Sequence, residues 1–183
     1  MAIYIGEYYL DSNVNDVRLV SPSSNSTIFN SSNGSIIKNG NPCFQATSSN
    51  GWVYHSSWQT QTFNEIIYNN GNYFDGTLFT APVKGSYFFS YQTYALKDTS
   101  GVGRYWHPLF SVNGSATNVR LGGSASTNYR MRSYNNPTDY DDLQIDDILY
   151  LQAGDNVQVT VFSSHSDNRL HGQYSFFTGS LLG

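Results

Sequence analysis

Five aspartates lie close together in the stretch 139–147 of this sequence. They are Asp139, Asp141, Asp142, Asp146 and Asp147. Closely spaced carboxylates repel one another unless they are solvated or share a hard cation such as calcium, which takes oxygen ligands. The spacing does not match an EF-hand loop. The stretch is therefore either a calcium site or a solvated acidic loop, and calcium is the one cofactor that the sequence raises.

Aromatic side chains offer a second kind of chemistry, the binding of sugars. The 183 residues include 15 Tyr, 11 Phe and 3 Trp, and an exposed ring can stack against the apolar side of a pyranose. We predict ligand-binding roles for four aromatic residues in expected loops or loop edges, namely Trp52, Trp58, Tyr105 and Trp106. The alternative is that these rings form core or subunit contacts.

Catalytic patterns are missing from the sequence. It contains no Gly-x-Ser-x-Gly elbow, His-Glu-x-x-His zinc motif or glycine-rich phosphate loop. A glycan-degrading enzyme that uses Asp141 and Asp146 is the weakest hypothesis, because two acids on an expected loop lack the paired positioning that glycoside hydrolysis needs. We expect a protein that is not an enzyme and requires no cofactor.

Charge and hydropathy exclude two classes of partner. The net charge is −4 with 9 Lys and Arg, whereas nucleic-acid binding needs clustered cations. No stretch is apolar and long enough to insert in a membrane, and no export signal follows Met1. The single cysteine, Cys43, excludes an internal disulfide and is expected to be a small buried residue.

The elements that must position these residues are expected to be β-strands. Aromatic and β-branched residues favour strands, Asn, Gly and Ser favour turns, and no amphipathic helix is visible. Residues 1–41 are predicted to form an arm with one or two short strands that need a neighbour. In the domain 42–183 we expect strands at 43–48, 63–68, 78–82, 86–95, 109–112, 118–121, 143–152, 156–162 and 174–183. Strands at this spacing predict two packed antiparallel sheets.

Three segments resemble the globular head of the C1q/TNF superfamily. Residues 79–90 are similar to its Phe-Thr-Ala-Pro-x-x-Gly-x-Tyr-x-Phe-Ser signature, and 149–157 and 177–182 resemble later segments in the same order. The resemblance implies an all-β, two-sheet antiparallel jelly-roll sandwich that forms a homotrimer. It gives fold-determining roles to Phe79, Pro82, Gly85, Tyr87, Phe89, Gly154, Asp155, Phe177 and Gly179. Of these, Gly85 and Gly154 are expected in tight turns and Pro82 at a strand end or edge.

The arm has a resemblance of its own. Ile3-Tyr4-Ile5-Gly6 is similar to short repeats near the start of some bacteriophage tail and fibre proteins, and no collagen-like stalk is present. The leading hypothesis is a virion protein, assembled in the host cytoplasm and acting outside the cell. Its head would recognise a host-surface glycan or protein, and its arm would attach to other virion proteins. The alternative is a bacterial or other C1q-like adhesive protein outside a virion.

Overall fold

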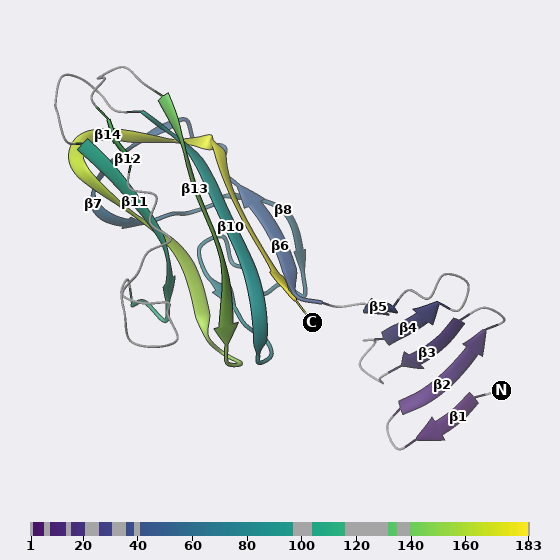
Figure 1. The fold of residues 1–183 in the computed structure, drawn as a ribbon. Helices are drawn as coiled ribbons and strands as arrows, with labels where there is room; N and C mark the ends of the chain where they lie inside the picture. The colour runs from purple at the N-terminus through teal and green to yellow at the C-terminus, as the bar shows by residue number, and fades with distance from the viewer. Residues whose placement is uncertain are drawn as a thin grey trace. The chain divides into compact units, whose positions relative to one another are not determined.

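The computed structural model describes residues 2–5, 8–13, 16–20, 26–30, 36–38, 41–96, 104–115, 132–134 and 140–182. The chain divides into two compact units, Met1–Asn41 and Pro42–Gly183, which we call the arm and the head. Every regular element in the described residues is a strand (Figure 1). Over these residues no helix is long and apolar enough to cross a membrane.

The arm is one antiparallel sheet whose five strands follow one another in chain order. The strands are β1 (Ala2–Ile5), β2 (Tyr8–Asn13), β3 (Asp16–Val20), β4 (Ser26–Asn30) and β5 (Ile36–Lys38). The prediction of one or two strands was therefore wrong. The polar stretches separate short strands rather than replace them, because a run of three to six residues is enough for each one.

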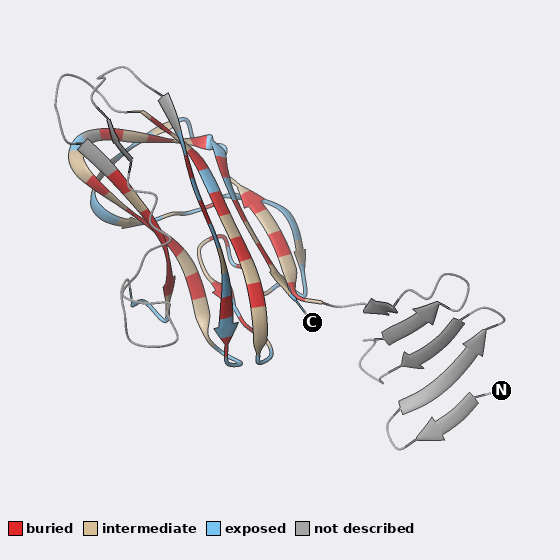
Figure 2. Ribbon diagram, in the orientation of Figure 1, coloured by how far each residue is buried: buried red, intermediate tan, exposed pale blue. Residues whose placement is uncertain are grey.

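The head contains nine strands among its described residues. They are β6 (Cys43–Thr47), β7 (Trp52–Thr60), β8 (Glu65–Asn70), β9 (Phe79–Thr80), β10 (Gly85–Leu96), β11 (Arg104–Val112), β12 (Arg132–Tyr134), β13 (Tyr140–Leu151) and β14 (Asn156–Leu181). Buried and more exposed residues alternate along many of them (Figure 2). This period of two places one side of each strand in a core.

Strand β14 is long enough to pair with strands of both layers. Its first half pairs with β11, β9 and the end of β7, and its second half pairs with β10, β6 and the start of β7. We call β8-β6-β14-β10-β13, with the start of β7, the β10 sheet, and the end of β7 with β9, β14, β11 and β12 the β11 sheet. The segments 156–162 and 174–183, expected as two strands, are thus parts of one.

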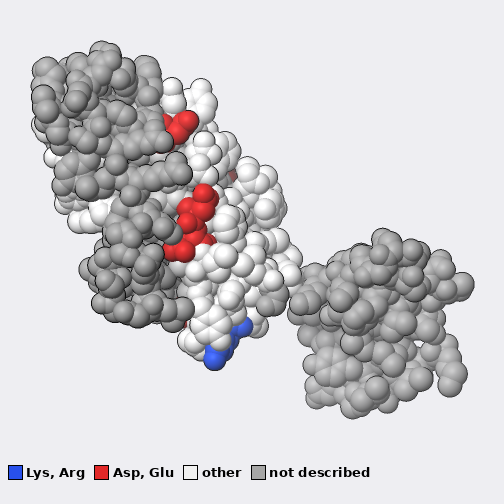
Figure 3. Space-filling view, in the orientation of Figure 1, with Lys and Arg blue, Asp and Glu red and all other residues white. Residues whose placement is uncertain are grey.

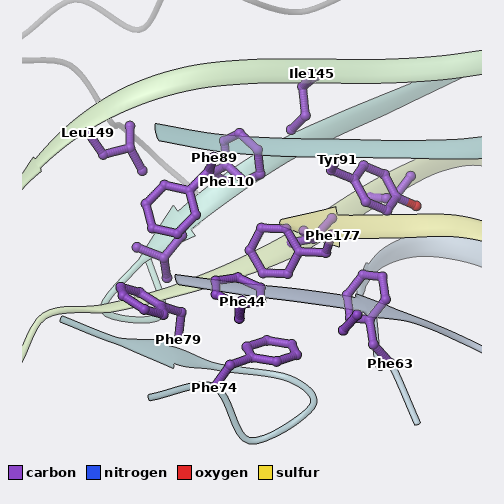
Figure 4. Close-up of a cluster of buried hydrophobic side chains, with 14 of the residues drawn as sticks. Phe44, Phe63, Phe74, Phe79, Phe89, Tyr91, Phe110, Ile145, Leu149 and Phe177 are labelled. Carbon is purple, nitrogen blue, oxygen red and sulfur yellow. The ribbon is translucent and has the colours of Figure 1, made fainter. Parts of the chain in front are cut away.

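Aromatic rings fill the space between the two sheets (Figure 4). Phe177 of the β10 sheet is fully buried, and its ring centroid lies 4.9 Å from that of Phe44 and 5.9 Å from that of Phe110 on the β11 sheet. Phe89 and Phe110 also meet across the layers at 5.8 Å. Aromatic contacts of this kind add to the gain from apolar burial, so they hold the sandwich together.

The residues of the C1q-like signatures lie in the core or at its ends. Phe79, Tyr87, Phe89 and Phe177 have no exposed surface, and Pro82 follows the end of β9. Gly154 has a φ of +91°, which a turn requires, and Asp155 Oδ2 accepts a 2.7 Å hydrogen bond from the Gln152 N–H beside it. These contacts close the β13–β14 turn.

Gly85 differs from its expected place in a turn. It is the first residue of β10, where a Cβ would lie 2.7 Å from Leu181 Cδ1. Close packing against the last strand, rather than a turn, therefore favours glycine here. The expected Asn113-Gly114 turn is present, with φ of +53° and +73°. Its expected return strand, 118–121, lies outside the described residues.

The close approach of Gly179 to the aromatic core gives a test of the packing. A Cβ at Gly179 would lie 2.5 Å from Phe44 Cε1 and 2.7 Å from Phe89 Cδ1, whereas a Cβ at Gly51 would meet nothing within 4 Å. We expect Gly179→Ala to lower the free energy of unfolding by about 1–3 kcal/mol through overpacking. Gly51→Ala, the matched control, should leave it nearly unchanged.

Urea denaturation at one fixed protein concentration measures both variants. Equal unfolding midpoints for Gly179→Ala and Gly51→Ala would contradict the close packing described for Gly179.

Candidate functional site

The outer face of the β10 sheet carries an aromatic cluster. The register places Trp52 of β7, His171 of β14 and Tyr94 of β10 in one row across three strands. The Trp52 and His171 rings meet edge to face with centroids 4.6 Å apart, and Tyr174 lies 4.5 Å from His171. The neighbouring Leu170 is buried, so this row faces away from the core. We call Trp52, Tyr94, His171 and Tyr174 the Trp52 cluster.

A bulge in β14 brings Tyr174 into this cluster. The pairing of β10 with β14 shifts so that residues 172–175 stand opposite Thr93. The hydroxyls of Thr93 and Ser175 are 2.6 Å apart, and Ser175 Oγ donates a 3.0 Å hydrogen bond to the His171 carbonyl oxygen. Thr93 and Ser175 are buried whereas Tyr174 is 56 % exposed. The buried hydrogen bonds thus fix a bulge that presents an exposed tyrosine.

A cation extends the same face by one row. Arg169 pairs with Tyr54 in the register, and its guanidinium carbon lies 5.1 Å from the centre of the Tyr54 ring. Tyr54 is 59 % exposed. A guanidinium at this distance is attracted to the ring face, so the outer face of the β10 sheet combines aromatic surface with a held positive charge.

A second aromatic group lies on the outer face of the β11 sheet. Trp58 of β7, Phe162 of β14 and His107 of β11 form one cross-strand row. The Trp58 centroid lies 5.1 Å from Phe162 and 5.3 Å from His107, and Trp58 keeps 43 % of its surface exposed. We call these three residues the Trp58 patch. The rings of Phe162 and His107 pack against the Trp58 indole while part of the indole stays exposed. A fixed, exposed ring of this kind is what a ligand needs for stacking.

Trp52 and Trp58 were expected in loops or loop edges, whereas both lie on β7. Trp52 is partly buried and Trp58 is exposed, and their ligand-binding roles stay predictions. Trp106 lies on β11 and is only 1 % exposed. Its predicted ligand-binding role is therefore wrong, because a sugar could reach the indole only if the core opened. Tyr105 also lies on β11, and its side chain lies outside the described residues.

From Tyr140 onward the acidic stretch is a strand rather than the expected loop. Tyr140–Leu151 forms β13, in which Leu143 and Ile145 are buried while Asp142 and Asp146 are exposed. The loop interpretation was wrong because apolar residues alternate with the carboxylates, and the sheet buries those apolar residues. Figure 3 shows acidic side chains at more than one place on the viewed face of the head.

The individual carboxylates of β13 differ in their surroundings. Asp146 Oδ2 accepts a 3.0 Å hydrogen bond from Gln144 Nε2, and Asp147 Oδ1 accepts one of 2.8 Å from the Ile148 N–H. The side chains of Asp139 and Asp141 lie outside the described residues. Among the side chains that the structure describes, no three His, Cys, Asp or Glu residues come together as metal ligands. Calcium binding stays a prediction.

Burial also affects the titration of the core tyrosines. Loss of solvation raises the pKa of Tyr91, which is fully buried. It also raises the pKa of Tyr87, although the Tyr87 hydroxyl donates a 2.8 Å hydrogen bond to the Val83 carbonyl oxygen. Both phenols are therefore neutral near pH 7, and they serve packing.

Several members of these aromatic groups were not predicted from the sequence. These are Tyr54, Tyr94, His171, Tyr174 and Phe162, which lie beside the expected residues only because β14 pairs with both β7 and β10. Strand β7 was itself missed, although the aromatic and β-branched residues of 52–60 favour a strand. Ser56 and Ser57 interrupt these residues and made the strand pattern hard to recognise.

Comparison with known proteins identifies the family of the head. The C1q domain pattern matches residues 43–182. The chain belongs to the C1q domain family. The head is thus a jelly roll of the C1q/TNF type, as the sequence predicted, and C1q heads are generally non-catalytic binding modules that form trimers.

Solved structures agree with the C1q fold. The globular domain of zebrafish complement 1qA protein is 19 % identical, with a TM-score of 0.54 over 78 % of this chain and 98 % of that one. Murine APRIL at pH 5.0 is 13 % identical, with a TM-score of 0.51 over 78 % of this chain and 99 % of its own. At these identities the likeness is one of fold.

His107 of the Trp58 patch is expected to make the stability of the head depend on pH. Desolvation by burial lowers the pKa of His107. The unfolded chain takes up a proton on this residue near pH 6.5, and the folded chain takes it up only at lower pH. Stability is therefore lost as the pH falls through about 6.5 towards the folded pKa.

We expect His107→Gln to flatten the dependence of the urea midpoint on pH between about 7.5 and 5.5. The parent protein at the same concentration is the reference. Parallel curves for variant and parent would show that His107 does not cause the loss.

Proposed function

We propose that this protein is a homotrimeric, non-enzymatic binding head of a virion, as a phage fibre, tail or capsid decoration protein. In this proposal the head recognises a host-surface glycan or protein. The observation that carries the proposal is the exposed aromatic surface of a C1q head. It lies on the outer faces of both sheets, so that one face can serve assembly while the other binds a ligand.

The outer face of the β10 sheet supports the trimer. Ile148 is 59 % exposed, Tyr150 is 48 % exposed and Phe176 is 36 % exposed, and all three lie on this face with the Trp52 cluster. Contiguous exposed apolar surface on a soluble protein marks an interaction site. Burial against two identical subunits would remove this surface from water.

Light scattering tests the trimer directly. We expect a mass of three 20.5 kDa chains at micromolar concentration. Ile148→Arg should shift this mass towards one chain, because the interface would have to bury three guanidinium groups at a high desolvation cost. Val83→Arg, at a 48 % exposed residue outside the strands, is the control and should remain trimeric.

Far-UV circular dichroism checks that both variants stay folded. A folded Ile148→Arg protein of full trimeric mass would exclude this face as the interface, and a monomeric parent would contradict the trimer itself.

The Trp58 patch is the proposed ligand site. It lies on the β11 sheet, so it stays open when the β10 sheet is covered. The exposed indole face offers an apolar platform, and the lowered pKa of His107 keeps that neighbour uncharged near neutral pH. A neutral platform of this kind fits the C–H face of a pyranose.

A glycan array and a host-cell binding assay test the site. We expect Trp58→Ala to weaken binding at least about tenfold, the equivalent of one or two lost stacking contacts. Trp58→Phe, which keeps a ring, should retain part of the affinity. Both variants should keep the mass of the parent. Equal binding by the parent and Trp58→Ala would place the ligand elsewhere.

Calcium enters the proposal through β13. Asp142 and Asp146 are exposed on the outer face of the β10 sheet, where carboxylates of three subunits could share a cation. The binding assay and the light scattering are therefore run with calcium and with chelator. Identical mass and binding in both would remove calcium from the proposal.

The virion setting is supported by the sequence of the arm. Its Ile-Tyr-Ile-Gly start and its Asn- and Ser-rich segments fit an appendage that assembles in the host cytoplasm and acts outside the cell, with the arm attached to other virion proteins. Neighbouring genes for tail or capsid components would support this setting. Ordinary bacterial neighbours would favour the adhesive alternative, and release of reducing sugar from host polysaccharide would favour the enzyme.

A further inference from the structure

The register of the arm sheet divides its residues into two faces. Directly paired residues share a face, and so do residues two apart in one strand. Ile3, Leu10 and Leu19 stand in one row across β1, β2 and β3, and Val17 and Phe29 lie in another row of the same face. We call this the first face. It comprises Ile3, Ile5, Tyr8, Leu10, Ser12, Val17, Leu19, Thr27, Phe29, Ile36 and Lys38.

The two faces have unlike chemistry. The second face carries Asp11, Asp16 and Arg18, and the register pairs Asp11 directly with Arg18. On the first face the only charged residue among the described strands is Lys38, in the last strand β5. The second face thus mixes charged and polar residues with apolar ones such as Val20, Ile28 and Ile37. The first face consists mostly of apolar residues.

The apolar first face needs a cover that the arm does not supply. The described strands of the arm form a single sheet, whereas stable domains bury the apolar side of a sheet against a second layer. A unit of this size, Met1–Asn41, is also too small for a sufficient core of its own. Another surface must therefore complete the arm.

The connection to the head identifies that surface. The arm continues into the head at Pro42, and C1q heads typically form trimers. Each trimer thus brings together three identical arm sheets, at an effective concentration on the order of millimolar. Two sheets packed face to face would leave the third uncovered. Three sheets around a threefold axis cover every first face and leave the charged faces in water.

We propose that the first faces of three arm sheets pack together around the threefold axis and form a shared apolar core. This inference rests on the trimeric head of the proposed function. It assigns the apolar side of the arm to copies of the same chain, and it leaves the charged face and the sheet edges for attachment to another protein.

Cross-linking of the full chain tests the arrangement. In a Cys43→Ser background, Leu19→Cys introduces a thiol on the first face, and Val20→Cys, the matched control, introduces one on the second face of the same strand. A bis-maleimide linker of about 10 Å spans the usual distance between packed sheets. We expect Leu19→Cys to give covalent dimers on a denaturing gel in several-fold higher yield than Val20→Cys.

The mass before cross-linking separates the two proposals. A trimeric protein in which Leu19→Cys cross-links no better than Val20→Cys overturns the arm core and leaves the trimeric head intact. The same result is expected if the first face packs against the head of its own chain or binds another protein. A monomeric protein contradicts the proposed function first, and the arm core with it.

Hydrogen exchange gives a second measurement on the trimer. Leu19→Asp should remove amide protection in β2, β3 and β4 at least several-fold while the head stays trimeric, and Val20→Asp should keep that protection. Equal protection in the two variants would overturn the inference.

Discussion

The pairing of one strand with both layers is the constraint on which the head depends. β14 lines the core with Val157, Val159 and Val161 in the β11 sheet and with Phe177 in the β10 sheet. It also carries Phe162 and His171, one member of each aromatic group. Because one continuous strand sets both registers, the two candidate surfaces are fixed relative to each other by backbone hydrogen bonds.

A strand shared by two layers must bend, and buried polar groups hold the bends. The register with β7 shifts between Ser163 and Asn168, where Asn168 Nδ2 donates a 2.9 Å hydrogen bond to Ser163 Oγ. The Thr93–Ser175 contact does the same at the later bulge. Bulges re-aim side chains beside functional sites, and in this head they separate one aromatic face from the other.

The sequence predicted the fold better than the site. The alternation in 156–162 and the signature at 79–90 identify inward residues directly, because burial follows a period of two. Trp58 and Trp106 illustrate the limit, since both are tryptophans in strand-forming segments, yet one is exposed and the other buried. Only the pairing of β14 with β7 and with β11 decides which position faces the core, and both pairings join residues far apart in the chain.

The long-range pairing of β14 also has a consequence for folding. Residues 169–181 of β14 join β6 and β10, which lie far from them in the sequence, so the β10 sheet closes only after long-range contacts have formed. Long-range strand pairing is slow to form. Until β14 has paired, a folding head exposes aromatic core residues, and it is during this interval that the chain is most prone to aggregate.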